Sequence, residues 1–178
     1  VPSEMPAGFP LEALKAQAVA ARSETLAKLG LVHASDPFDL CADVHCQVYS
    51  GLSKRTVVTD RAVEETEGIV LFYENEICDA VYSSVCGGHT ENNQITWGGA
   101  ARPYLQGNWD GPSVLKQYGD LSHEKNVRSW IRNAPLAYCQ SNREPMDRSL
   151  DYTKKYYRWE VTYSQQGLQQ IVQNKTGK

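Results

Sequence analysis

The chain has 178 residues, enough for one domain with a buried core. Its formal net charge is −3 and its pI is near 5.8, so no general positive charge indicates nucleic-acid binding. It contains neither an apolar run long enough to cross a membrane nor a signal-peptide pattern at its start.

Local signals predict a long helix and a long loop in the first third of the chain. The helix begins at Pro10, a favoured first-turn residue, and runs to about Leu29, with Gly30 as its stop. Residues 31–56 form a loop rich in Asp, His and Cys, which is too long to be without a role in a compact domain. Residues 62–66 follow as a short helix or turn.

Two strands are predicted next, at residues 69–73 and 77–82, and a short polar link makes them a hairpin. A helix capped by Ser122 reaches about Arg132. Alternating apolar and polar residues predict a half-exposed strand at 157–163.

Ser164 caps a final helix. The predicted fold class is therefore α+β, with a small antiparallel sheet, a long N-terminal helix and extended loops. The whole chain is expected to form a single domain.

The first helix carries an unusual pattern of charges. Glu4 lies just before it, and the apolar side of the helix is mostly alanine, which lets a neighbouring element approach closely. Lys15 and Arg22 lie about two turns apart on a common stripe. A carboxylate that faces two cations can hold a polyhydroxyl or anionic ligand. The ordinary alternative is that Glu4 caps the helix or pairs with Arg22, and that both cations are solvated.

Five cysteines is an odd number, so they cannot all form disulfides within one chain. Cys41, His45 and Cys46, with His33 upstream, form a candidate Cys₂His₂ site for zinc. Such a zinc ion would be structural, because all four coordination positions would be filled. The alternative is a disulfide between Cys41 and Cys46, or from Cys86 to one of them.

Two further groups of residues have competing interpretations. Cys86 and His89 offer the thiol and base of a peptidase-like site, although such partners are normally distant in sequence and no third orienting residue is evident. Trp97, Tyr104 and Trp109 can stack against sugars, but aromatic residues are more often part of a core.

The run from Ser3 to Arg22 closely resembles the signature of the sporulation stage II protein D family and of the related amidase-enhancer domains, which act on bacterial peptidoglycan. The resemblance continues in four later blocks, at residues 38–51, 62–68, 82–91 and, more weakly, 102–105. Family members carry strands before the first block and a further strand after the last helix. The resemblance therefore implies a family domain trimmed at both ends, with any targeting segment or membrane anchor outside this sequence.

The resemblance implies a lytic transglycosylase that cleaves the bond from N-acetylmuramic acid to N-acetylglucosamine and leaves a 1,6-anhydro end. Glu4 stands at the position of the family's catalytic acid, and Lys15 and Arg22 stand at cleft positions on the helix. Some family members bind zinc through two Cys and two His in the following loop. The remaining candidates for substrate binding are Gln47, Tyr49, Ser83, Ser84, Gly87 and Gly88.

One carboxylate can suffice for this reaction, because the sugar's own 6-hydroxyl closes on C1 as an intramolecular nucleophile. Glu4 would protonate the leaving oxygen and later accept the hydroxyl proton, which requires a pKa raised towards neutrality. The alternative is a non-catalytic module that binds cell-wall glycan and relies on a partner amidase for chemistry. Both functions place the protein outside the cytoplasm, in contact with peptidoglycan.

Overall fold

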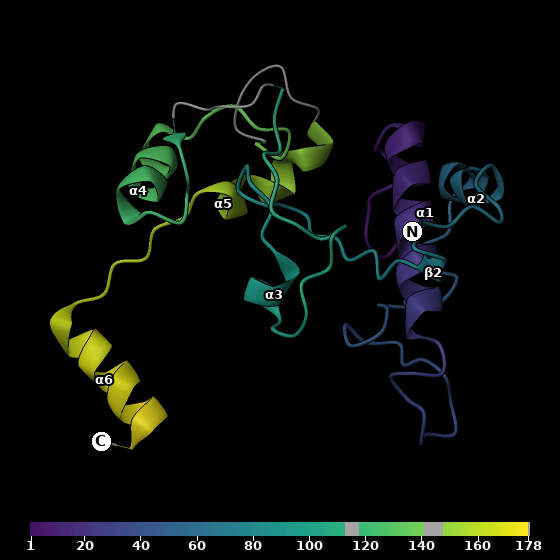
Figure 1. Ribbon diagram of the computed structural model, residues 1–178, viewed down its shortest axis with the longest axis horizontal. Coiled ribbons are helices and arrows are strands. Elements are labelled where there is room, and N and C mark those ends of the chain that lie inside the picture. The colour runs from purple at the N-terminus through teal and green to yellow at the C-terminus, as the bar shows by residue number, and fades with distance from the viewer. Residues whose placement is uncertain (113–117, 141–147, 178) are drawn as a thin grey trace. The chain divides into compact units, whose positions relative to one another are not determined.

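The computed structural model describes residues 1–112, 118–140 and 148–177. The chain divides into two compact units, the first comprising Val1–Ser84 and Trp97–Gln106, the second Val85–Thr96 and Gly107–Lys178. The elements in chain order are α1 (Leu11–Lys28), α2 (Val57–Glu64), β1 (Phe72–Tyr73), β2 (Glu76–Ile77), α3 (Asn93–Thr96), α4 (Glu124–Asn133), a 3₁₀ helix (Arg148–Thr153), α5 (Lys154–Tyr157) and α6 (Gln165–Thr176) (Figure 1). The α+β class predicted from the sequence is confirmed, with helices and one small antiparallel sheet.

The two helices of the first unit begin where local signals place or allow a cap. Pro10 precedes α1, and Gly30 follows it with a φ of +70°, a left-handed conformation that glycine adopts without strain. α2 begins earlier than the predicted helix or turn, because Thr56 and Thr59 form a reciprocal capping box. The hydroxyl of Thr56 accepts the Thr59 N–H at 3.2 Å, and the Thr59 hydroxyl accepts the Thr56 N–H at 3.1 Å.

Small side chains let α2 pack closely against α1, as the alanine-rich face of the first helix predicts (Figure 1). Leu14 and Ala18 of α1 are buried, and so is Ala62 of α2. Ser23 of α1 is fully buried and ties the helix to the hairpin, since its hydroxyl accepts the Leu71 N–H at 2.9 Å. α1 is therefore the element around which the first unit is built.

The predicted hairpin is present, but its strands are shorter than predicted. Phe72 pairs with Ile77 and Tyr73 with Glu76. The two linking residues have positive φ values, 50° for Glu74 and 67° for Asn75, which matches the tight turn that two-residue hairpin loops favour.

In the second unit, α4 begins after His123, one residue beyond the predicted cap. The final helix, α6, begins as predicted, because the Ser164 hydroxyl accepts the Gly167 N–H at 3.1 Å. Within the described part of the chain, no helix combines the length and apolar character needed to cross a membrane.

The predicted strand at 157–163 is wrong. Tyr157 ends the short helix α5, and its buried hydroxyl donates to the Pro135 carbonyl at 2.9 Å. The Arg158 guanidinium lies over the Trp130 ring, 4.5 Å from its centroid. These two contacts fix the start of the segment through partners more than twenty residues earlier in the sequence, which local alternation cannot reveal.

Candidate functional site

A cavity of about 370 Å³ lies in the first unit beside the C-terminal half of α1. Glu4 lines it, together with residues from the C-terminal half of α1, from the long loop and from the segment after the hairpin. Its lining residues are Glu4, Glu24, Lys28, Val44, His45, Cys46, Gln47, Val48, Val81, Tyr82 and Trp97. Of the candidates from the sequence, the cavity thus brings together Glu4, Gln47, His45 and Cys46.

Glu4 is held in place through its backbone rather than through its carboxylate. A tight turn precedes α1, in which the N–H groups of Glu4 and Met5 both donate to the Val1 carbonyl at 3.0 Å. Within the described chain, no hydrogen bond or ion pair engages the half-buried Glu4 side chain. Its carboxylate is therefore available to a ligand in the cavity.

The second carboxylate of the cavity has a different environment. Glu24 accepts hydrogen bonds from Lys28 Nζ at 2.8 Å and from the Gln47 amide at 2.7 Å. The Tyr82 hydroxyl donates to the Gln47 side-chain oxygen at 3.0 Å, which extends the network across the cavity wall. Because both Lys28 and Gln47 engage the Glu24 carboxylate, Glu24 is suited to positioning the groups around it.

Tyr82 keeps its proton over a wide pH range. Partial burial raises the pKa of its hydroxyl, and the nearby carboxylates of Glu4 and Glu24 add to this effect. The hydroxyl therefore remains a hydrogen-bond donor next to the acid.

Four metal-ligating side chains from the long loop meet beside this cavity. The ligand atoms of His33, Cys41, His45 and Cys46 all lie within 4.8 Å of one another. A tetrahedral zinc site places nitrogen and sulfur ligands about 3.5 Å apart, given bonds of about 2.0 Å to nitrogen and 2.3 Å to sulfur. The distances here are 3.2 Å from His33 Nε2 to Cys46 Sγ, 3.8 Å from Cys41 Sγ to His45 Nδ1, and 3.7 Å from Cys46 Sγ to His45 Nδ1. The geometry therefore fits a Cys₂His₂ metal site, even though two ligands are adjacent in sequence.

The surroundings of the cluster also suit a cation. The backbone N–H of Asp43 donates to the Cys41 sulfur, and with His33 and His45 nearby this lowers the pKa of Cys41 to about 6. A thiolate is the form that binds metals. Asp36 accepts a hydrogen bond from His33 Nδ1 at 2.7 Å, which leaves Nε2 directed at the cluster. A carboxylate behind a histidine ligand is the usual second layer of zinc sites in proteins.

The cluster and the cavity share one stretch of chain. His45 and Cys46 are both metal-ligand candidates and cavity-lining residues, and Cys46 is buried. Lys28 Nζ donates to the Cys46 carbonyl at 2.9 Å while it also pairs with Glu24. A metal ion in the cluster would therefore fix the loop that forms a wall of the Glu4 cavity.

Lys15 and Arg22 share one side of α1, as predicted, but that side meets the end of α2. Lys15 pairs with Glu12 at 2.8 Å and with Glu65, the residue after α2, at 2.6 Å. Neither cation is among the described residues that line the Glu4 cavity. The structure therefore places Lys15 in a contact between α1 and the end of α2, and the arrangement in which both cations face Glu4 is not seen among the described contacts.

Arg22 is engaged by backbone carbonyl groups. Its Nη1 donates to the Thr66 carbonyl at 2.7 Å and to the Ile69 carbonyl at 2.8 Å, just beyond the C-terminus of α2. A cation at this place also interacts favourably with the helix dipole. The arginine joins α1 to the chain after α2, which is a structural role that the sequence interpretation did not foresee.

The other substrate-binding candidates are not among the described residues that line the cavity. Tyr49 is 64% exposed, and Ser83 and Ser84 are exposed at the end of the first unit. Gly87 and Gly88 belong to the second unit. Gly88 is buried, and a Cβ on it would come within 3.1 Å of Ala137 and 3.3 Å of Trp130, so the expectation that it lines a cleft is corrected: it permits close packing.

The peptidase-like alternative gains no support from the geometry. His89 Nδ1 donates to the Thr90 carbonyl at 2.6 Å, whereas the Cys86 thiol contacts Asp110 and Cys139. Among the described residues, Cys86 and His89 therefore do not form a thiol–base pair.

The three candidate stacking aromatics have separate surroundings. Trp97 lines the Glu4 cavity and is 66% exposed, so its ring is free to stack on a ligand. Tyr104 packs against Tyr73 with ring centroids 5.5 Å apart. Trp109 belongs to the second unit.

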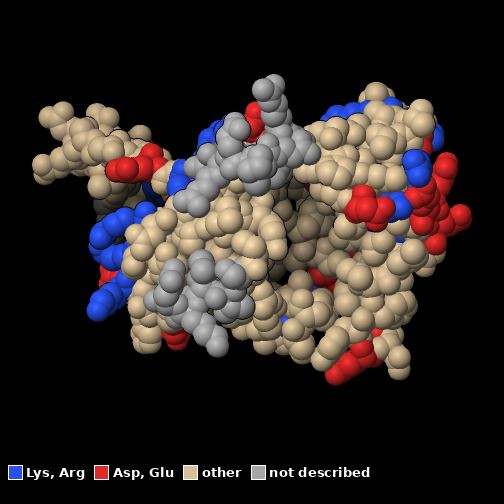
Figure 2. Space-filling view, turned by 90° about the horizontal axis from the view of Figure 1, so that it is seen from above, with Lys and Arg blue, Asp and Glu red and all other residues tan. Residues whose placement is uncertain are grey.

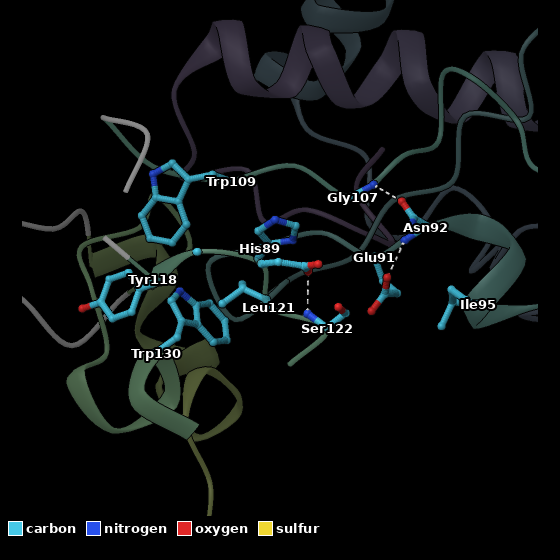
Figure 3. A pocket seen from close by; sticks show the side chains of 12 residues that line it. His89, Glu91, Asn92, Ile95, Gly107, Trp109, Tyr118, Leu121, Ser122 and Trp130 are labelled. Carbon is cyan, nitrogen blue, oxygen red and sulfur yellow. Dashed lines mark hydrogen bonds between the residues drawn. The ribbon is translucent and has the colours of Figure 1, made fainter. Parts of the chain in front are cut away.

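A second cavity, of about 800 Å³, lies within the second unit (Figure 3). Trp109, Tyr118 and Trp130 line it, and their rings are grouped on one side in Figure 3, with Glu91 and Asn92 on the other. It contains none of the acid, cation or metal-ligand candidates of the first unit. The Glu4 cavity is therefore the better candidate for an active site.

Three of the cavity's polar residues were not predicted as site residues. Glu24 and Lys28 are four apart on α1 and have the spacing of an ordinary surface ion pair. Tyr82 stands at the end of a predicted strand, next to the serines that were selected instead. Only the fold shows that the long loop brings Gln47 between them.

The surface agrees with the charge balance of the sequence. Most of the face in Figure 2 carries neither Lys or Arg nor Asp or Glu, and the charged side chains lie in groups of both signs. That face offers no broad basic area of the kind that binds nucleic acid.

Comparison with known proteins shows which family the first part of this chain resembles. Residues 1–73 match the family model described as "Stage II sporulation protein" (SpoIID). The chain is 43% identical to the amidase enhancer of Bacillus subtilis (strain 168) over 106 residues, which are 59% of this chain and 14% of that protein. It is 38% identical to the stage II sporulation protein D of Bacillus amyloliquefaciens over 120 residues, which are 60% of this chain and 35% of that protein.

A third relative, the stage II sporulation protein D of Bacillus subtilis (strain 168), is 37% identical over 121 residues, again with 35% of its length covered. The chain thus spans about a third or less of these relatives, and no solved structure gives a significant match. The resemblance inferred from the sequence motifs is confirmed.

Proposed function

We propose that this chain is the catalytic part of a peptidoglycan lytic transglycosylase, because residues 1–73 match the family model of the stage II sporulation protein. It would cleave glycan strands between N-acetylmuramic acid and N-acetylglucosamine and leave 1,6-anhydro ends. The observation that carries the proposal is the unpaired Glu4 carboxylate at a cavity that also holds an exposed tryptophan and a ring of hydrogen-bonding groups. Its place of action would be the cell wall, outside the cytoplasm.

The two carboxylates of the cavity support a mechanism with one acid. Glu24 is paired with Lys28 and bound by the Gln47 amide, so protein groups already engage its carboxylate. The Glu4 carboxylate makes no hydrogen bond or ion pair within the described chain and can therefore meet a ligand. Glu4 is therefore the acid and base of the proposed reaction, and Glu24 positions the residues around it.

Glu4 acts twice in the proposed reaction. It first protonates the glycosidic oxygen as the bond from C1 to that oxygen breaks. The resulting carboxylate then accepts the proton of the 6-hydroxyl while that oxygen bonds to C1, which closes the anhydro ring. An intramolecular nucleophile of this kind has an effective molarity of roughly 10⁵ M or more, so a second catalytic carboxylate is not required.

The remaining cavity residues can hold the sugar. Trp97 presents an exposed ring of the kind on which sugar faces stack. The Tyr82 hydroxyl and the Gln47 amide already share a hydrogen bond at 3.0 Å and can direct further donors and acceptors at sugar hydroxyls. These residues take the binding role first expected of Lys15 and Arg22.

We further propose that His33, Cys41, His45 and Cys46 hold a structural zinc ion. The nitrogen–sulfur distances near 3.5 Å and the Asp36 carboxylate behind His33 support this ligand set. Four protein ligands leave no open position, so the metal would act on structure. It would hold the wall formed by residues 44–48 against α1.

The test is cleavage of purified glycan strands in water enriched with ¹⁸O. A lytic transglycosylase releases anhydro ends without ¹⁸O, whereas hydrolysis adds one labelled oxygen to each new reducing end. We expect Glu4→Gln to lower the rate by about 10²–10⁴-fold, the usual contribution of a general acid. The matched control is Glu67→Gln, which changes an exposed glutamate outside the cavity.

A second candidate function rests on the name of the amidase enhancer, of which this chain covers 14%. In that case the chain would bind glycan and stimulate a separate cell-wall amidase without cleaving strands itself. Strand binding with no anhydro product, together with a faster amidase reaction, would support this function and refute the transglycosylase.

A further inference from the structure

A second group of cysteines belongs to the second unit, whereas the four proposed zinc ligands belong to the first. The sulfurs of Cys86 and Cys139 are 3.4 Å apart, and the Cys86 thiol donates to Asp110 Oδ2 at 3.3 Å. Both cysteines are only half-buried, so small thiol reagents can reach them. They are 53 residues apart in the sequence, and their approach is a property of the fold.

The backbone around Asp110 holds the two cysteine segments together. The Asp110 N–H donates to the Gly88 carbonyl at 3.0 Å, and the Tyr138 N–H donates to the Asp110 carbonyl at 2.8 Å. Asp110 thus bridges the segment of Gly88 and the segment of Tyr138. Cys86 is two residues before Gly88, and Cys139 directly follows Tyr138. Arg158 adds a further anchor, since its Nη1 donates to the Gly87 carbonyl at 2.8 Å. The thiols therefore lie close together without depending on their own interaction.

The number of ligands in this group suits a disulfide better than a metal site, and the separation of the sulfurs allows the bond to close. A disulfide bond is about 2.05 Å long, so closing it requires a movement of about 1.3 Å, which two side chains pivoting at Cβ can share. The described group also offers only three ligands, Cys86, Asp110 and Cys139.

The distribution of the five cysteines agrees with this pairing. Cys41 and Cys46 belong to the cluster with two histidines. Cys78 is 6% exposed and lies in the first unit, and burial raises the pKa of its thiol, so it is an inert core residue. Cys86 and Cys139 are the two that remain, which accounts for the odd number.

We propose that Cys86 and Cys139 form a disulfide when the protein meets an oxidant of the disulfide class, such as oxidised glutathione or the active-site disulfide of a thiol oxidoreductase. The bond would close the chain from residue 86 to residue 139 into a loop. That loop contains α4 and all the described residues that line the cavity of Figure 3.

The order of the exchange follows from the environments of the two thiols. The Cys86 S–H beside Cys139 lowers the pKa of Cys139 to about 7, and the same contact raises the pKa of Cys86. The Cys139 thiolate attacks one sulfur of the oxidant, forms a mixed disulfide and displaces the other sulfur as a thiolate. Cys86 then loses its proton to the neighbouring Asp110 carboxylate and attacks the Cys139 sulfur. The bond to the oxidant breaks, two electrons have passed to the oxidant, and the oxidant leaves as two thiols.

The test is made on the full chain, incubated with oxidised glutathione and then treated with a thiol-alkylating reagent under denaturing conditions with a chelator. Digestion with trypsin and with an enzyme that cuts before aspartate separates Cys78 from Cys86 at Asp79. We expect mass spectrometry to find the Cys86 peptide joined to the Cys139 peptide and Cys78 fully alkylated. We expect the oxidised chain to melt at least about 5 °C higher than the reduced chain.

Single substitutions supply the control. In Cys86→Ser and in Cys139→Ser, reductant should no longer change the melting temperature, and the reduced variants should melt close to the reduced parent chain. Alkylation of both Cys86 and Cys139 after oxidation would overturn the proposal. A metal ion retained in the Cys41→Ser/Cys46→Ser variant and lost in Cys86→Ser would overturn it as well, since it would assign the pair to a second metal site.

Discussion

Replacement of Arg22 by methionine is the perturbation that best separates a structural from a substrate-binding role on α1. Methionine keeps an apolar stem of similar length but removes the guanidinium, so the Thr66 and Ile69 carbonyls lose their donors at 2.7 and 2.8 Å. The contact to Thr66 is partly buried, whereas that to Ile69 is exposed. Water can therefore replace the second hydrogen bond more easily than the first.

The magnitude follows from these two hydrogen bonds. A hydrogen bond with a charged partner contributes about 1.5–3 kcal/mol, and exposure reduces that contribution. We expect Arg22→Met to lower the free energy of unfolding by about 2–3 kcal/mol, a large part of the stability of a small domain. With a denaturant slope of about 1–3 kcal/mol per molar urea, the midpoint should fall by about 1–2 M.

Stability is measured by urea unfolding, followed by circular dichroism. Strand cleavage is measured separately, without urea and at a temperature well below the melting transition. The matched control is Arg55→Met, because Arg55 pairs with Asp60 on the surface and its side chain is 55% exposed, so its loss should change the midpoint little. An unchanged midpoint in Arg22→Met together with lost cleavage would refute this reasoning and return Arg22 to the substrate site.

The remaining predictions concern the cavity, the metal and pH. Glu24→Gln should slow strand cleavage less than Glu4→Gln, since it disturbs positioning but leaves the acid, and turnover of the two variants on one substrate measures this. Cys41→Ser should abolish zinc binding and lower the melting temperature, which elemental analysis and calorimetry check against the chelated parent chain. Lys15→Met should destabilise the protein at neutral pH. Lys15 and then Arg61 lower the pKa of Glu65. The ion pair of Lys15 with Glu65 therefore stabilises the fold above the ordinary carboxyl pKa of 4.5, and this stabilisation is lost as the pH falls through the lowered pKa. In urea titrations, the difference in unfolding free energy between Lys15→Met and the parent chain should vanish in acid.

Helix ends were predictable because their signals are local. Pro10 before α1 and Ser164 before α6 act through their own backbone geometry or through a residue three positions away. The hairpin turn was predictable for the same reason. The strand at 157–163 was not, because Tyr157 and Arg158 are held by Pro135 and Trp130, far away in the sequence.

The residues of the candidate site likewise differ in whether the sequence could predict their contacts. Glu4 was selected through the family resemblance and the four metal-ligand candidates through their residue types, and the fold gathers the four ligands as expected. The partners of Lys15 and Arg22 could not be predicted, because Glu65 and the carbonyls after α2 lie more than forty residues later. A cation on a helix does not reveal from the sequence alone whether it meets solvent, substrate or another helix.

Lys28 is the residue through which the metal cluster and the acid cavity are joined. Its ammonium group binds Glu24 at 2.8 Å and the Cys46 carbonyl at 2.9 Å, so one side chain contacts both the cavity network and the proposed metal loop. Glu24 in turn holds Gln47, one residue beyond Cys46. Displacement of the loop would therefore break the contacts of Lys28 with the His45 and Cys46 carbonyls and that of Glu24 with Gln47. These contacts hold the groups that line the Glu4 cavity against α1. A structural metal ion in this cluster would thus influence the proposed catalysis without touching the substrate, because it would fix the loop that forms a wall of the Glu4 cavity.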